Sequence, residues 1–135
     1  MSFTRAGLVL LLALVLSSAV LADDWVSVGD DDMGAHSINR SMRMPTGHLV
    51  FWKRTALAPE RTRKMPYFRE FRVTTIEAQV EWDAEAGRFR FRKRILARAD
   101  RSVVESWDEP TPWEEPYAGS VMVKAIQAAE AQARQ

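Results

Sequence analysis

The clearest alternation of apolar and polar residues lies in two segments on either side of a predicted turn at residues 83–87. In the first segment, Glu77, Gln79 and Glu81 alternate with the apolar positions Ile76, Ala78, Val80 and Trp82. In the second, Arg88, Arg90, Arg92 and Arg94 alternate with positions that include Phe89, Phe91 and Ile95. Successive side chains of a strand point to opposite faces, so the pattern predicts a β-hairpin with one apolar and one charged face.

One register satisfies both faces of this hairpin. On the apolar face it pairs Trp82 with Phe89, Val80 with Phe91 and Ile76 with Ile95, and on the charged face it pairs Glu81 with Arg90, Gln79 with Arg92 and Glu77 with Arg94. Each cross-strand pair contributes about 0.2–1 kcal/mol, so the ladder mainly fixes the register. Lys93 is the one misfit, because this register places it on the apolar side opposite Ala78.

The apolar positions change parity just before the hairpin. Phe71 and Val73 are odd-numbered, whereas the apolar positions from Ile76 onwards are even-numbered. If one strand runs through both, the change near residues 74–75 requires a bulge, a strong bend or a change of sheet face.

The rest of the chain predicts shorter elements. Strands are expected at residues 25–28, 34–38, 48–55 and 102–107, and a proline-interrupted basic loop, long enough to be a mobile flap, at 56–66. Ser120 can cap a helix over residues 121–134, whose apolar stripe includes Val121, Ala125, Ile126 and Ala129. The pattern predicts an α+β domain: a single antiparallel sheet of about five or six strands with a C-terminal amphipathic helix packed on one face.

Residues 1–22 are typical of a cleavable signal peptide. Arg5 precedes an apolar run from Leu8 to Leu16, and small residues lead to a cleavage site after Ala22. The alternative is an uncleaved N-terminal anchor. Cleavage would leave residues 23–135 as one domain with no membrane span, exported to the periplasm, the cell surface or the medium. The chain contains no cysteine, so it is not expected to be a lipoprotein.

Charge and composition exclude several classes of function. Without cysteine the chain has no thiolate nucleophile, zinc–thiolate site or iron–sulfur cluster. Its 19 basic and 18 acidic side chains give no overall signature of nucleic-acid binding. Only His36 and His48 are near-neutral acid–base groups, and neither lies in a metal-binding motif. We therefore expect no catalytic residue, no metal site and no cofactor.

The arginine row is the main candidate for a contact surface. The predicted register places Phe89 and Phe91 on the opposite face, so they cannot stack bases beside the arginines. The row is either a solvated charged face or an electrostatic contact surface for a protein or an acidic glycan. The candidate partner-binding residues are Arg88, Arg90, Arg92 and Arg94 of the row, with Arg61 and Arg63 of the 56–66 loop.

Several short motifs, taken in order, resemble the bacterial surface-adhesin protein E-like envelope proteins. They are Trp25-Val26-x-Val28-Gly29, His36-Ser37-Ile38, Leu49-Val50-Phe51-Trp52, the glutamate strand through Glu81, the arginine-containing return strand, Val103-Val104-x-Ser106-Trp107, and Pro116-x-x-Gly119-Ser120 before the last helix. The resemblance covers nearly all of residues 23–135. It implies a small antiparallel sheet with a C-terminal helix that works in the envelope by binding.

The sequence departs from that family at two cysteine positions. Family members typically carry a cysteine near the position of Trp82 and another near the end of the helix, and this chain has neither. We expect packing of Trp82 against Ile126 or Ala129 to replace that tie.

Three functions remain open. The first is a non-enzymatic, exported binding domain that contacts a macromolecule through the basic sheet face. The second is a structural envelope protein that forms a homodimer through a sheet edge and has no external ligand. The third is a small periplasmic hydrolase, which an activity dependent on His36 or His48 would support.

Overall fold

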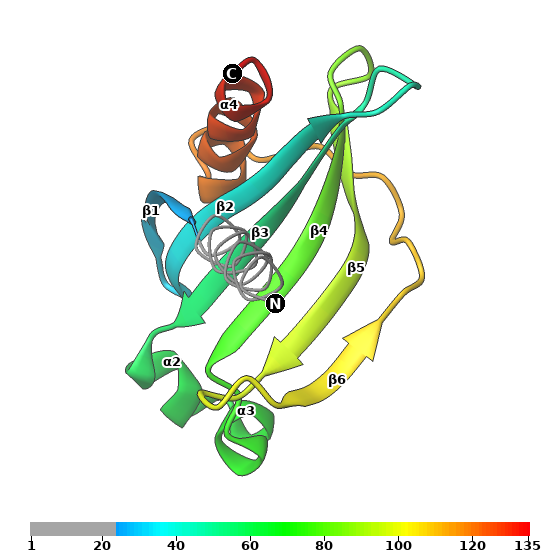
Figure 1. The fold of residues 1–135 in the computed structure, drawn as a ribbon. Coiled ribbons are helices and arrows are strands. Elements are labelled where there is room, and N and C mark those ends of the chain that lie inside the picture. Colours follow the sequence, from blue (N-terminus) through cyan, green and yellow to red (C-terminus); the bar gives the residue numbers. More distant parts are fainter. Residues whose placement is uncertain (1–23) are drawn as a thin grey trace, which may run out of the picture.

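A computed structural model describes residues 24–135 and shows one six-stranded antiparallel sheet with strand order β1-β2-β3-β4-β5-β6 (Figure 1). The strands are β1 (Val26–Asp31), β2 (Gly34–Arg43), β3 (Leu49–Leu57), β4 (Thr75–Asp83), β5 (Arg88–Ala97) and β6 (Val103–Trp107). The helices are α2 (Pro59–Lys64), α3 (Pro66–Phe71) and α4 (Val121–Ala133). The α+β prediction is confirmed, whereas the expected signal peptide at residues 1–22 lies outside the described residues.

The main core lies under α4, which packs against β1–β3, and extends to Val80 on β4 and Phe89 on β5. Phe51 and Ile38 on the strands and Ala125 and Ala129 on the helix are fully buried in it. The hydroxyl of Ser120 accepts a hydrogen bond from the Val123 amide at 3.4 Å, as expected for an N-cap. The alanines leave room for α4 to lie close to the sheet. Trp82 packs against this cluster, whose members include Ile126 and Ala129, and a direct contact of the ring with either residue stays a prediction.

A second core lies at the other end of the same sheet face. It is formed by Leu57, Phe68, Val73 and Leu96. The segment predicted as a flexible loop at residues 56–66 instead contains α2 and leads into α3, which places Phe68 in this core. The change of apolar parity has a simpler cause than a bulge. Phe71 ends a helix, Arg72 adopts a left-handed conformation with φ 58°, and the strand begins only at Thr75.

The predicted β4–β5 register is correct in the half of the hairpin next to the β4–β5 turn and wrong in the half farther from it. Trp82 pairs with Phe89, Glu81 with Arg90 and Val80 with Phe91, as expected. The register then shifts, and Gln79 pairs with Lys93 instead of Arg92. Arg92 is thus the extra residue of a β-bulge, which accommodates one unpaired residue in an otherwise regular ladder. Below the bulge, Ala78 pairs with Arg94, Glu77 with Ile95 and Ile76 with Leu96, so each predicted partner is displaced by one residue.

The connection from β6 to α4 continues the edge of the sheet. Beside the upper half of β5, Glu114 forms an isolated bridge with Phe89, and the Thr111 amide donates to the Phe91 carbonyl at 2.9 Å. The three prolines of residues 108–119 keep this segment extended. As Figure 1 shows, the segment runs from the end of β6 along the sheet to the start of α4.

Candidate functional site

The arginines predicted as one contact surface lie in several separate places. Arg88 and Arg90 precede the bulge and lie on the sheet face opposite α4, which we call the open face. Arg94 follows the bulge and shares the α4 side with Ala78, where its guanidinium lies 5.1 Å from the centre of the Trp107 ring. The idea of a single arginine row from Arg88 to Arg94 is therefore wrong, because the extra residue Arg92 reverses the alternation.

Arg61 and Arg63 do not extend the remaining row. Both lie on α2, beyond the lower ends of the strands, whereas Arg88 lies beside the β4–β5 turn at the upper end (Figure 1). Arg61 is partly buried, and its Nε lies 3.2 Å from the Met33 sulfur. Arg63 is exposed. A ligand would have to span the length of the sheet to contact all of these cations.

The open face instead contains a groove of about 270 Å³ across its centre. Its lining residues are Trp25, Arg40, Trp52, Arg54, Glu77, Lys93 and Ile95. Three of them are cations and one is an anion, so the groove is electropositive. Arg40 is exposed and has a left-handed conformation with φ 56° at the β2 bulge, which interrupts pairing between Asn39 and Met42.

The groove is organised by a stacked and hydrogen-bonded arginine. The Arg54 guanidinium lies 4.0 Å from the centre of the Trp25 ring, a cation–π distance. Its Nε and Nη2 contact Glu77 Oε1 at 3.0 and 2.9 Å. These contacts fix the guanidinium plane before a ligand binds. The Trp25 Nε1 atom is buried without a hydrogen-bond partner.

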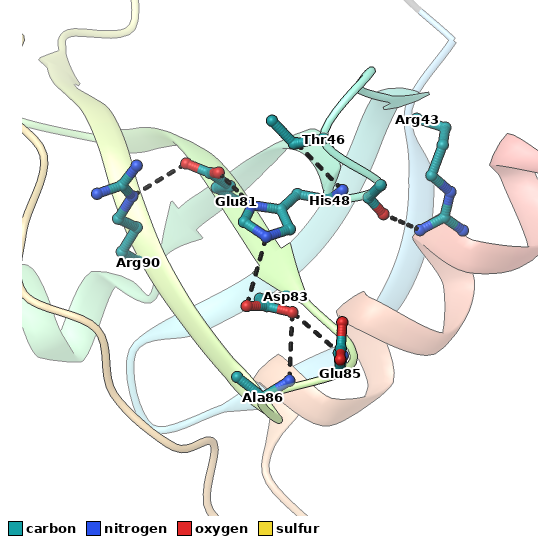
Figure 2. A network of polar contacts seen from close by, with 9 residues as sticks. Arg43, Thr46, His48, Glu81, Asp83, Glu85, Ala86 and Arg90 are labelled. Carbon is teal, nitrogen blue, oxygen red and sulfur yellow. Dashed lines mark hydrogen bonds and ion pairs between the residues drawn. The ribbon is translucent and has the colours of Figure 1, made fainter.

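A second polar network lies near the upper end of the sheet (Figure 2). His48 lies between two carboxylates, with Nδ1 2.7 Å from Glu81 Oε2 and Nε2 3.4 Å from Asp83 Oδ2. Arg90 Nε donates to the other Glu81 oxygen at 2.9 Å. The Trp113 ring lies beside both basic residues, 4.4 Å from the Arg90 guanidinium and 5.7 Å from the His48 ring.

The electrostatics of this network centre on Glu81. Burial by itself raises the pKa of this carboxyl, but hydrogen bonds from His48 and Arg90 and their charges outweigh it and hold the pKa below its usual 4.5. Every oxygen of Glu81 is thus occupied by a neighbour. The arrangement ties the residue before β3 to strands β4 and β5.

The groove residues were not predicted, because the row of arginines is the more prominent pattern of charge in the sequence. Trp52 and Arg54 alternate with buried Phe51 in the segment predicted as a strand at 48–55, so their common face could have been read from the sequence. The predicted position of Lys93 was a second sign in the sequence that the assumed register was wrong. An ammonium group predicted on the apolar face was the sign that one residue of β5 had to be extra.

No part of the described region suggests a metal ion or a bilayer-spanning helix. Within residues 24–135, His, Asp and Glu side chains nowhere gather in a group of three that could hold a metal. The helices of the same region are all too short or too polar to cross a bilayer. Comparisons of this chain with protein-family models, with curated proteins and with solved structures give no match.

Proposed function

We propose that this protein is a non-enzymatic, exported binding domain that holds an acidic glycan on the open face of its sheet. The observation that carries the proposal is the electropositive groove lined by Trp25 and Trp52, with the Arg54 guanidinium already fixed against one ring. The order of motifs that resembles the surface-adhesin protein E-like proteins agrees with export and binding.

The chemistry of the groove favours a saccharide with carboxylate groups. Indole rings offer flat apolar surface to the C–H faces of sugar rings, and arginine matches the two oxygens of a carboxylate. The groove lies over β2–β5, in the interior of the sheet, where strand pairing already uses the backbone groups. An extended peptide usually joins a sheet at an edge, so a ligand here must be recognised by side chains.

The cations differ in how free they are to contact a ligand. Arg54 is paired with Glu77, and Lys93 Nζ lies 3.4 Å from an oxygen of Asp108. The Lys93–Asp108 pair is solvent-exposed, with side chains 42% and 77% accessible, and exposed pairs of this kind are weak. Lys93 and the exposed Arg40 therefore supply the charge that an acidic ligand would neutralise.

The test is calorimetric titration with an oligogalacturonate and, as matched ligand, its uncharged methyl ester. We expect the double variant Arg40→Glu/Lys93→Glu to lose at least about tenfold in affinity, equivalent to about 1.4 kcal/mol. The control Arg61→Glu/Arg63→Glu changes the same charge on α2 and should bind like the unaltered protein.

Two results would overturn the proposal. One is equal binding by the groove variant and the unaltered protein. The other is no binding of the acidic saccharide, together with a stable dimer in sedimentation, which would favour the structural homodimer that pairs through a sheet edge. A loss of binding in the α2 control alone would move the site to Arg61 and Arg63 on α2.

A further inference from the structure

The α4 side of the sheet contains a hydrogen-bonded chain of polar residues that the open face does not use. His36 on β2 and Thr55 on β3 are each only 5% exposed, and they are paired neighbours in the sheet. Thr55 Oγ1 lies 3.1 Å from His36 Nδ1, and His36 Nε2 lies 2.6 Å from Asp31 Oδ1. At the other end, Lys53 Nζ donates to Thr55 Oγ1 at 3.1 Å.

The hydrogen bonds of this chain can all be donated in one direction, from Lys53 towards Asp31. Asp31 also accepts from the Met33 and Gly34 amides. Burial by itself raises the pKa of Asp31, but these bonds and His36 hold the pKa below its usual 3.8. An ionised carboxylate only accepts, so His36 Nε2 is the donor to Asp31, and His36 Nδ1 accepts from the Thr55 hydroxyl in the neutral ring. The Thr55 oxygen is then left to accept the hydrogen bond from Lys53.

The chain runs along the wall of a cavity. A cavity of about 190 Å³ has Asp31, His36 and Lys53 in its lining, beside apolar groups of Phe89, Val121 and Met122. The Asp31 side chain is 42% exposed and ends the chain at the surface. A proton that leaves Lys53 thus has a path to solvent through two buried side chains.

We propose that Lys53 is a capture site for a small uncharged aldehyde or ketone, which it binds reversibly as an imine in this cavity. The Nζ lone pair forms a bond to the carbonyl carbon, and the carbonyl oxygen takes up a proton. That oxygen then leaves as water, so one ammonium and one carbonyl give one protonated imine and one water. No oxidant or reductant is needed.

Two features of the surroundings favour a neutral carbonyl over an anion. Burial lowers the pKa of Lys53 from 10.5 to about 8, although the Asp31 charge opposes this, so about one tenth of the amine is uncharged at pH 7. Glu114 and Glu115 also line the cavity and would repel an anionic ligand. The other charged or titratable groups nearby are Arg94 on β5, Lys124 on α4 beside Gly29, and Tyr117 in the connection.

The test is reductive trapping of the full chain with benzaldehyde and cyanoborohydride, followed by peptide mass spectrometry. We expect Lys53 to be benzylated about tenfold faster than the exposed Lys64 and Lys124, with a rate that rises to a midpoint near pH 8. Oxidised dextran, a polymer too large for the cavity, should label Lys64 and Lys124 and leave Lys53 unlabelled.

Substitutions separate the site from general lysine chemistry. Lys53→Arg should abolish the fast labelling and leave Lys64 and Lys124 unchanged. Thr55→Val nearly preserves the shape of the side chain but removes the hydroxyl, and it should slow Lys53 labelling and shift its pH midpoint. Equal labelling of all three lysines in the folded protein, or equal access of dextran to Lys53, would overturn the proposal. Neither result bears on glycan binding, which is measured on the other face.

Discussion

The two faces of the sheet use polar side chains in opposite ways. On the α4 side, the polar groups of His36 and Thr55 are almost completely buried and form a single chain of hydrogen bonds among apolar neighbours. On the open face, Arg54 and Glu77 form a partly exposed pair within a groove. The difference teaches that strand alternation decides which face a side chain takes, whereas the covering segments decide how much that choice affects stability.

The largest expected effect comes from two adjacent residues that point to opposite faces. Phe51→Ala removes a fully buried ring beneath α4 and should lower the free energy of unfolding by about 3–5 kcal/mol. Trp52→Ala removes a half-buried ring from the groove and should cost much less stability, while weakening glycan binding. Urea unfolding and calorimetric titration of both variants measure the two effects. Equal losses of stability would contradict the assignment of α4 as the cover of the core.

The next effect concerns the bulge that separates the two halves of β5. Deletion of Arg92 removes the extra residue and leaves the pairs above and below it intact, so we expect a small loss of stability. Deletion of Ile95 moves buried Leu96 to the open face and should cost about 2–3 kcal/mol. Urea unfolding gives the free energies, and amide exchange of β5 reports the register. The reverse order of stability would mean that Arg92 is not the extra residue.

Much of this fold could be predicted from the sequence because alternation and helix periodicity are local signals. The C-terminal helix, its Ser120 cap and the upper half of the hairpin were predicted correctly. The bulge was not, because Lys93 and the surrounding arginines are all basic and a shift by one residue leaves the pattern of charges almost unchanged. The misfit of Lys93 was the only local trace of the shift.

The candidate sites were harder to predict because they join residues from distant parts of the chain. His36 lies in no metal-binding motif of the sequence, and only the pairing of β2 with β3 brings it beside Thr55. Likewise, the groove depends on the register of four strands. A single segment carries no signal for such a contact, so each residue taken alone had an ordinary structural explanation.

A moderate effect is expected at Glu81, which is part of the open face but is buried by its neighbours. Glu81→Gln should lower the free energy of unfolding by about 1–3 kcal/mol at neutral pH, because the Arg90 guanidinium loses its charged partner and the hydrogen bond between His48 and the carboxylate is weakened. The folded state holds the pKa of Glu81 below 4.5, so this stabilisation is present above that value and is lost as the pH falls through the folded pKa. The variant should therefore lose less stability than the unaltered protein on acidification below about pH 5, measured by urea unfolding across pH. Parallel acid profiles would contradict the assignment.

The smallest effect should come from the half-exposed pair in the groove. The Arg54 and Glu77 side chains are 36% and 28% exposed, so a double-mutant cycle of Arg54→Met and Glu77→Gln should give a coupling energy below about 1 kcal/mol. Because water and ions reach this pair, the coupling should fall further in 1 M salt, where the screening length is about 3 Å. The matched cycle of Arg90→Met and Glu81→Gln should give a larger coupling that salt changes less, since the Glu81 side chain is only 10% exposed. If the two cycles gave the same coupling and the same dependence on salt, the burial of Glu81 would not distinguish the two pairs.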